Sequence, residues 1–214
     1  MITVFGEGRG LRVVWLLEEM ALAYRLRPVD LLAGAEEDAE FFAINPAGFI
    51  PAIRDGDVTM VESIAIMEYV MARYGPTPLA PDPQDPAFPA YQQFLHLGEA
   101  GLATAMFFYV NARRLPTEAE QRNPTAAHTL AQFESRMDLV TRQLERTPYL
   151  AGETFTASDI SVTYALNLAE RGGGVVFDKA VQTYLERIRG RGAYGRALDA
   201  CGATKAWYAS AEDQ

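Results

Sequence analysis

Residues 45 to 63 hold the groups with the clearest capacity to bind a ligand. Pro51 follows the β-branched Ile50 and opens a short apolar run. A proline there begins a strand without a backbone N–H for the sheet, and such a position suits a cis peptide bond. Backbone groups of Phe49 and Ile50 that are left out of the sheet could pair with an extended peptide. This bend is therefore a candidate peptide-binding edge.

The same stretch ends at a candidate anion site. Ser63 stands before apolar residues at helical spacing, from Ile64 to Val70, and serine is favoured at the start of a helix. The N–H groups at a helix start have no partner within the helix and attract anions. Ser63 is therefore predicted to cap this helix and, with the helix start, to hold a carboxylate.

Alternating strands and helices must position both features. Asp55-Gly56 is typical of the turn of a two-residue hairpin, whose strands contain Ala52 and Val58. Before the hairpin, the patterns predict strands at 2–5 and 24–27, a helix from 11 to 20 and a weaker helix at 35–44. This order predicts a mixed sheet with helices on its faces, forming an α/β domain over residues 1–75.

The rest of the chain has a different character. Residues 76–89 contain half of all the prolines and are predicted to be a linker. Thr156 and Asp159 are predicted to form a capping box. Residues 90–214 show no strand pattern and are predicted to form an all-helical domain. Its helices are predicted at 91–115, 123–146, 156–170, 178–189 and 194–201.

Composition and charge exclude several classes of protein. The chain has 214 residues, is 49% hydrophobic and carries a formal net charge of -9, with a pI near 4.8. A chain of this length and hydrophobicity can build a sizeable core, and its acidity argues against nucleic acid or an anionic membrane surface as a partner. The most apolar stretch, 102–110, is far shorter than the ~20 residues that cross a bilayer.

Cysteine and histidine usage narrows the chemistry further. Cys201 is the only cysteine and cannot form an internal disulfide, and the N-terminus lacks the features of a secretory leader, so a cytoplasmic protein is expected. His96 and His128 are not at metal-ligand spacing with acidic partners, so no metal site is predicted. A thiol–disulfide oxidoreductase needs a nucleophilic cysteine at the first strand–helix turn, far from Cys201, and is excluded. Cys201 is expected to be inert.

Three motifs taken together resemble a known family. They are the run N-P-A-G-F-I-P-A-I with a following E-S, the run Y-L-A-G-E-T-F-T-A-S-D at 149–159, and a weaker pair of segments at 185–188 and 191–194. All three are similar to motifs of the cytosolic glutathione transferases, with Ser158 in place of the usual alanine and Gly192 in place of proline. The resemblance covers nearly the whole chain. It implies a thioredoxin-like first domain, an all-α second domain and a homodimer.

The resemblance also assigns binding roles. It implies that Pro51 is cis and that Ile50, with Phe49 beside it, pairs through its backbone with the cysteinyl part of glutathione. Glu62 and Ser63 would hold the γ-glutamyl end, so glutathione is the expected co-substrate. The helix from 91 would form one wall of the pocket for a hydrophobic electrophile. Its candidate lining residues are Met106, Tyr109 and Arg113.

The catalytic turn departs from the family pattern. A free glutathione thiol has a pKa near ~8.5, so a transferase must favour the thiolate with a hydroxyl or another donor. Family members commonly place Tyr, Ser or Cys at the first strand–helix turn, where this chain has Gly8 between Glu7 and Arg9. The remaining candidates are Arg9, the backbone N–H groups of Gly8 to Gly10, and a hydroxyl such as that of Tyr109. Glu7 would oppose them if it pointed inward, because a second negative charge disfavours a thiolate.

Two functions therefore compete. The first is a glutathione transferase that joins the bound thiolate to hydrophobic electrophiles, a detoxification chemistry, with Arg9 and the turn amides as the leading catalytic groups. The second is a non-catalytic glutathione-binding or scaffold protein of the same fold, in which Arg9 is a solvated loop residue. The turn at Gly8 discriminates between them. Isomerisation and dehalogenation with glutathione would use the same first domain.

Overall fold

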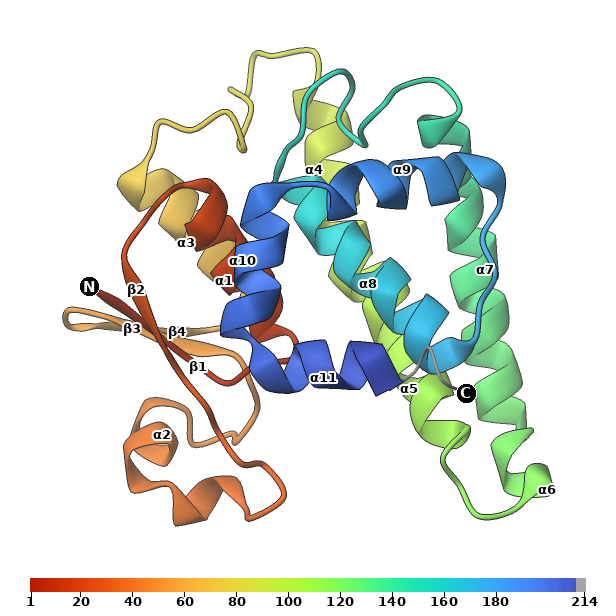
Figure 1. Ribbon diagram of the computed structural model, residues 1–214, viewed down its shortest axis with the longest axis horizontal. Helices are drawn as coiled ribbons and strands as arrows, with labels where there is room; N and C mark the ends of the chain where they lie inside the picture. The colour runs from red at the N-terminus through yellow and green to blue at the C-terminus, as the bar shows by residue number, and fades with distance from the viewer. Residues whose placement is uncertain (211–214) are drawn as a thin grey trace. The chain divides into compact units, whose positions relative to one another are not determined.

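The computed structural model describes residues 1–210 and divides into two compact units (Figure 1). Unit 1 contains Met1–Thr77 together with the chain from Gly190 onward, and unit 2 contains Pro78–Arg189. The first boundary lies close to the one predicted near residue 75. The second differs from the prediction, because the segment after Gly190 belongs to unit 1 and not to the helical domain.

A four-stranded sheet forms the centre of unit 1. The strands are β1 Ile2–Phe5, β2 Tyr24–Arg27, β3 Ala52–Asp55 and β4 Val58–Val61. Their order in the sheet is β2-β1-β3-β4, with β1 and β2 parallel and the other two pairings antiparallel. The parallel pair is joined through a helix, as a parallel connection requires, whereas β3 and β4 form a tight hairpin. The mixed sheet is confirmed.

The two faces of the sheet carry different helices. Successive strand residues point to opposite faces, so Val4 faces α1 (Gly10–Glu19) while Phe5 faces α2 (Ala39–Ile44). Phe5 packs with Ala52 and with Phe41 of α2 in one buried cluster. A short 3₁₀ turn, η1 Ala35–Glu37, precedes α2 and divides the single helix predicted at 35–44. The division falls at Asp38, whose carboxylate accepts from Phe41 N–H and pairs with Arg27.

The hairpin turn lies one residue later than predicted. Asp55 pairs with Val58, so the two loop residues are Gly56 and Asp57 instead of Asp55 and Gly56. Gly56 has φ +60°, whereas neither Asp55 nor Asp57 has a positive φ. A glycine at the first loop position is typical of a type II′ turn, which accounts for the shift. The hairpin itself is confirmed.

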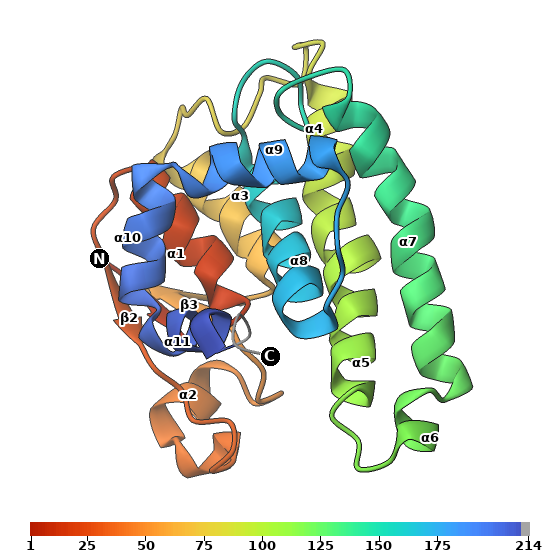
Figure 2. The same ribbon diagram turned by 45° about the vertical axis from the view of Figure 1, so that its right-hand side comes forward.

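The chain after Gly190 returns to unit 1. It forms α10 (Gly192–Ala200) and α11 (Gly202–Ser210), and α10 runs beside α1 in both views (Figures 1 and 2). Tyr194 packs edge-on against Trp15, with ring centroids 4.8 Å apart. Arg191 forms a bidentate pair with Glu19, with both N–O distances 2.7 Å. The last helix predicted from the sequence ends at Cys201, so α11 was not predicted.

The regular elements of unit 2 are all helices, as predicted, and an isolated β-bridge joins Tyr149 and Gly152. The helix α3 (Ser63–Tyr74) ends before this unit. No helix or strand forms between Tyr74 and Phe88. The long helix predicted at 91–115 is divided by a π-helical segment, η2 Leu97–Ala103. The other helices are α4 Phe88–His96, α5 Thr104–Ala112, α6 Glu118–Gln121, α7 Pro124–Leu144, α8 Ala157–Gly173 and α9 Lys179–Arg189. Figure 2 shows α5 and α7 side by side, with α8 against α4 and α5.

No helix within residues 1–210 combines the length and the apolar character that a bilayer span needs.

The predicted capping box starts α8. The Asp159 carboxylate accepts from the backbone N–H of Thr156 at 2.9 Å and from that of Leu150 at 3.0 Å. It also accepts from the Tyr184 hydroxyl at 3.1 Å. Burial raises the pKa of Asp159 to about 6, against the opposing effect of these hydrogen bonds. The box therefore joins the start of α8 to the preceding loop and to α9.

Asp159→Ala is expected to lower the free energy of unfolding by about 2 to 4 kcal/mol, because two buried N–H groups and a buried hydroxyl lose their acceptor. Urea unfolding measures the loss. Asp159→Asn keeps an acceptor oxygen and serves as the matched control, with a smaller loss expected. A loss below about 1 kcal/mol for the alanine variant would show that these bonds contribute little.

Candidate functional site

The first strand–helix turn and the proline bend lie against each other. Gly6 has φ +84°, and a Cβ on it would lie 2.3 Å from Cγ2 of Ile50. A Cβ on Gly10 would lie 3.5 Å from Cβ of Pro51. Only a glycine at position 6 permits this approach and this backbone conformation. The predicted catalytic turn and the predicted peptide-binding edge are thus brought together within unit 1.

The bend itself is held by a buried asparagine. Asn45 is 3% exposed, donates to the carbonyl of Phe49 at 2.6 Å and accepts from Ala47 N–H at 3.2 Å. The Ile50–Pro51 peptide bond is cis, which confirms the prediction. Within residues 1–210 the backbone N–H and C=O of Ile50 make no hydrogen bond. Ile50 therefore presents a donor and an acceptor beside the turn, whereas the Phe49 carbonyl is already engaged.

Ser63 does not cap its helix. It is the first residue of α3, and the N-cap position belongs to Glu62, whose side chain makes no capping hydrogen bond. The Ser63 hydroxyl oxygen instead accepts from Nη1 of Arg12 at 3.1 Å. Both side chains are buried, with Ser63 3% exposed and Arg12 fully covered. The prediction that Ser63 is the cap was therefore wrong by one position: the helix begins at Ser63 and not after it.

Arg12 gives the predicted anion site its charge. Its guanidinium binds the Ser63 oxygen, so the hydroxyl proton of Ser63 remains free to point at another acceptor. A buried cation beside a hydroxyl and the N–H groups of a helix start favours an anion. Arg12 was not among the residues predicted from the sequence to form the site. The available signal was a charged residue within the apolar run 11–17, because a charge on a helix covered on all sides must meet a partner.

Glu62 stands at the edge of this site. It is exposed and has φ +71°, a conformation that non-glycine residues rarely adopt. The conformation turns the chain sharply from β4 into α3, and the Glu62 carbonyl accepts from Ile66 N–H at 2.9 Å. Glu62 is therefore an exposed residue directly before Ser63, at the position predicted to hold the γ-glutamyl end of glutathione.

The turn amides are engaged by the protein. Gly8 N–H donates to the Thr204 hydroxyl oxygen at 3.1 Å, and Gly10 N–H donates to the Glu7 carbonyl at 3.0 Å. Arg9 is half-buried at the N-cap position of α1. Gly8 has φ +62°, so a serine at this position would adopt a strained backbone. The catalytic role predicted for the two amides would require their present hydrogen bonds to be exchanged.

Unit 2 separates the three residues predicted for the electrophile pocket. Tyr109 and Arg113 line a cavity of about 520 Å³ between α5, α6 and α7, a size suited to small molecules. The Arg113 guanidinium stacks 5.9 Å from the Tyr109 ring centroid and donates to the Gly173 carbonyl. Met106 is fully buried next to Gly173 and does not line this cavity. The other lining residues are Gln121, Arg122, Ala126, Ala127 and Leu130.

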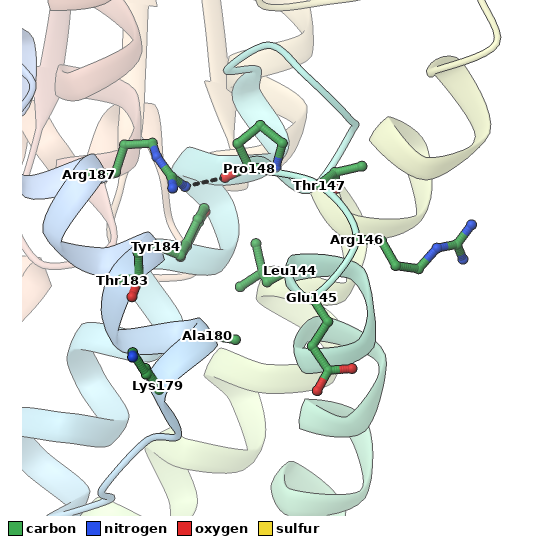
Figure 3. Close-up of a pocket in the computed structure, with 10 residues that line it drawn as sticks. All are labelled: Leu144, Glu145, Arg146, Thr147, Pro148, Lys179, Ala180, Thr183, Tyr184 and Arg187. Carbon is green, nitrogen blue, oxygen red and sulfur yellow. Dashed lines mark hydrogen bonds between the residues drawn. The ribbon is translucent and has the colours of Figure 1, made fainter.

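A second cavity, of about 500 Å³, lies between the end of α7 and α9 (Figure 3). Arg187 lies on one side of this cavity and donates to the Pro148 carbonyl at 2.6 Å. The side chain of Arg146 points away from the cavity. None of the residues predicted from the sequence lies here, so this cavity is not the candidate site.

Two further expectations concern metal and sulfur. In the described part of the chain, no group of three or more His, Cys, Asp or Glu side chains is placed to hold a metal ion. Cys201 is fully buried, and burial, with a smaller effect of the Glu7 charge, raises the pKa of its thiol to about 12. A buried, protonated thiol is a poor nucleophile, which agrees with the expectation that Cys201 is inert.

Comparisons with known proteins agree with this geometry. A family model described as "Glutathione S-transferase, N-terminal domain" matches residues 2–72. Glutathione S-transferase 3 of Zea mays is 30% identical over 196 residues, which cover 88% of this chain and 88% of the relative. The disulfide-bond oxidoreductase YfcG of Escherichia coli (strain K12) is 30% identical, over 88% of this chain and 89% of the relative.

A solved structure is similar as well. It is a theta class glutathione S-transferase from Xanthomonas axonopodis pv. citri with glutathione bound. It has a TM-score of 0.78 and 25% identity, and the similarity covers 92% of this chain and 96% of that protein.

The contact between Arg12 and Ser63 is expected to be energetically coupled. Ser63→Ala should lower the free energy of unfolding by about 1.5 to 3 kcal/mol, because a charged hydrogen bond is lost in the core. In an Arg12→Met background the same change should cost less by about 1 kcal/mol or more. Urea unfolding of the four proteins in this cycle gives the coupling. Additive losses would mean that the two side chains act independently.

Proposed function

This chain belongs to the glutathione S-transferase family, and we propose that it joins the thiolate of bound glutathione to hydrophobic electrophiles. In the broad sense it is a glutathione transferase with glutathione as its co-substrate. The conjugation of a carbon electrophile is the specific proposal. The observation that supports it most is the free backbone of Ile50, held at a cis proline beside the first turn of α1.

The polar groups of unit 1 suit the two ends of a glutathione molecule. A peptide lying along Ile50 would exchange backbone hydrogen bonds with it, as an added strand does. At the other end, the Ser63 hydroxyl with the Arg12 charge behind it suits the carboxylate of the γ-glutamyl group. Glu62 beside Ser63 suits the amino group of the same residue, because a carboxylate favours a nearby cation.

The proposed reaction needs a thiolate at the turn. The thiol proton is released to solvent, and an electron pair of the thiolate sulfur forms a bond to an electrophilic carbon. Either a leaving group such as chloride departs with its bonding pair, or the π electrons of a carbon–carbon double bond move into a conjugated carbonyl and the product takes up a proton from solvent. Arg9 is the proposed stabiliser of the thiolate, because it stands at the start of α1, where the helix dipole also favours negative charge. On the electrophile side, Tyr109 and Arg113 are proposed to bind the substrate through their shared cavity.

A second candidate follows from the relative named as a disulfide-bond oxidoreductase. The bound thiolate would attack one sulfur of a disulfide, forming a mixed disulfide with glutathione and releasing the other sulfur as a thiolate. In this chemistry the nucleophile is the sulfur of glutathione, so no protein cysteine is needed and the inert Cys201 does not oppose it. Parallel assays with 1-chloro-2,4-dinitrobenzene and with 2-hydroxyethyl disulfide distinguish the two chemistries. Failure of both, with glutathione bound, would favour the non-catalytic binding protein.

The setting proposed for this activity follows the family resemblance. The protein is proposed to act in the cytoplasm as a homodimer and to contribute to detoxification.

Ser63→Ala is expected to weaken glutathione binding about 10- to 100-fold, because the ligand carboxylate loses a charge-assisted hydrogen bond worth about 1.5 to 3 kcal/mol. Isothermal titration calorimetry measures the affinity. Ser63→Thr keeps the hydroxyl and serves as the control. An unchanged affinity in Ser63→Ala would remove Ser63 from the site.

Arg9→Ala is expected to slow conjugation of 1-chloro-2,4-dinitrobenzene more than it weakens glutathione binding, because the thiolate loses a cation while the peptide contacts remain. Steady-state rates and calorimetry on the same preparations give the comparison. Arg9→Lys keeps the charge and should retain more of the rate. Equal rates in the variant and the unaltered protein would return Arg9 to the role of a solvated loop residue.

A further inference from the structure

The helix that the sequence did not predict contacts the catalytic turn. Thr204 is the third residue of α11, and it is 7% exposed. Its hydroxyl oxygen accepts from Gly8 N–H at 3.1 Å, and the same hydroxyl lies 3.3 Å from Oε2 of Glu7. Its backbone N–H donates to that Oε2 at 2.9 Å. A single residue therefore contacts both members of the turn at positions 7 and 8.

The contact places the charge of Glu7 at the end of a helix. The N–H groups of the first turn of α11 have no partner within the helix, and a carboxylate near them is stabilised by the helix dipole. Thr204 adds a hydroxyl donor to the same oxygen. Two donors thus bind the carboxylate that would otherwise oppose a thiolate at the turn.

The surroundings of Glu7 contain few other groups that could take this role. Cys201, at the end of α10, is near enough for the Glu7 charge to contribute to the raised pKa of its thiol, which remains protonated at neutral pH. Arg9 follows on the same turn as a charged neighbour. Among the described residues, Thr204 is the one that the hydrogen bonds join to Glu7 from another element.

We propose that Thr204 is a positioning residue for catalysis: by binding Glu7 and Gly8 together, it keeps the Glu7 carboxylate on the N-terminus of α11 and so limits the repulsion of a thiolate at the turn. The inference rests on the proposed function. It explains how a turn that holds a glutamate and lacks a hydroxyl of its own could still serve a transferase. It also assigns a role to the C-terminal segment in the chemistry of the first strand–helix turn.

The test is a cycle of four proteins: the unaltered chain, Thr204→Val, Glu7→Gln and the double variant. The apparent pKa of the bound thiol is measured from the ultraviolet absorbance of glutathione thiolate, after calorimetry has established that each protein is saturated. Thr204→Val should raise this pKa by about 0.5 or more, because the hydroxyl no longer binds the carboxylate. In the Glu7→Gln background the same change should have a smaller effect. Thr204→Ser keeps the hydroxyl and should restore the unaltered value.

Several results would overturn the inference. One is an unchanged pKa in a folded Thr204→Val variant, with folding checked by thermal unfolding. Another is an equal rise in the unaltered and the Glu7→Gln backgrounds, which would show that the charge of Glu7 is not involved. Should Thr204→Val fail to fold, the Glu7→Gln variant alone decides. A fall of the thiol pKa by about 0.5 or more in this variant would mean that Glu7 repels the thiolate despite Thr204, whereas a smaller change supports the proposal. Failure of the unaltered protein to bind glutathione would instead reject the proposed function itself, and this inference with it.

Discussion

One close approach of two backbones holds the candidate site together. Because Gly6 carries no side chain, Ile50 packs directly on it, where a Cβ would lie 2.3 Å from the Ile50 side chain. The positive φ of Gly6 meets the same requirement, since few other residues adopt it without strain. This contact sets the bend at Pro51 against the turn that opens α1. The free backbone of Ile50 and the proposed position of the sulfur are therefore fixed relative to each other by packing within unit 1.

Two polar contacts extend the site from this centre. Arg12, two residues beyond Gly10, carries a positive charge to Ser63 at the start of α3. Glu7, one residue after Gly6, carries a negative charge in the other direction, to the start of α11. Hydrogen bonds that involve a charged group are stronger than neutral ones, and both of these lie in largely covered surroundings. The cation of Arg12 therefore lies at the proposed carboxylate site, and the anion of Glu7 lies at the C-terminal segment.

The sequence predicted those features that depend on neighbouring residues. The strands, the hairpin, the cis proline and the helical second unit follow from local periodicity and from the chemistry of proline, so they were found. The place of Ser63 in its helix and of Gly56 in its turn was missed by one residue, because element ends depend on tertiary contacts. Arg12 is recognisable in the sequence as a charge within an apolar run, but its partner Ser63 lies 51 positions away and was not predicted. Nothing in the sequence indicates the role of Thr204, because its partners lie almost 200 residues earlier and its helix is short.

The central claim is that this turn favours a thiolate although no residue within it carries a hydroxyl or a thiol. The most direct measurement is an ultraviolet titration of the unaltered protein saturated with glutathione, following the thiolate absorbance against pH. If the turn favours the thiolate, the apparent pKa of the bound glutathione thiol lies well below the value near ~8.5 of a free thiol. A pKa close to the free value, with calorimetry showing that glutathione is bound, would contradict the account and leave a protein that binds glutathione without activating it.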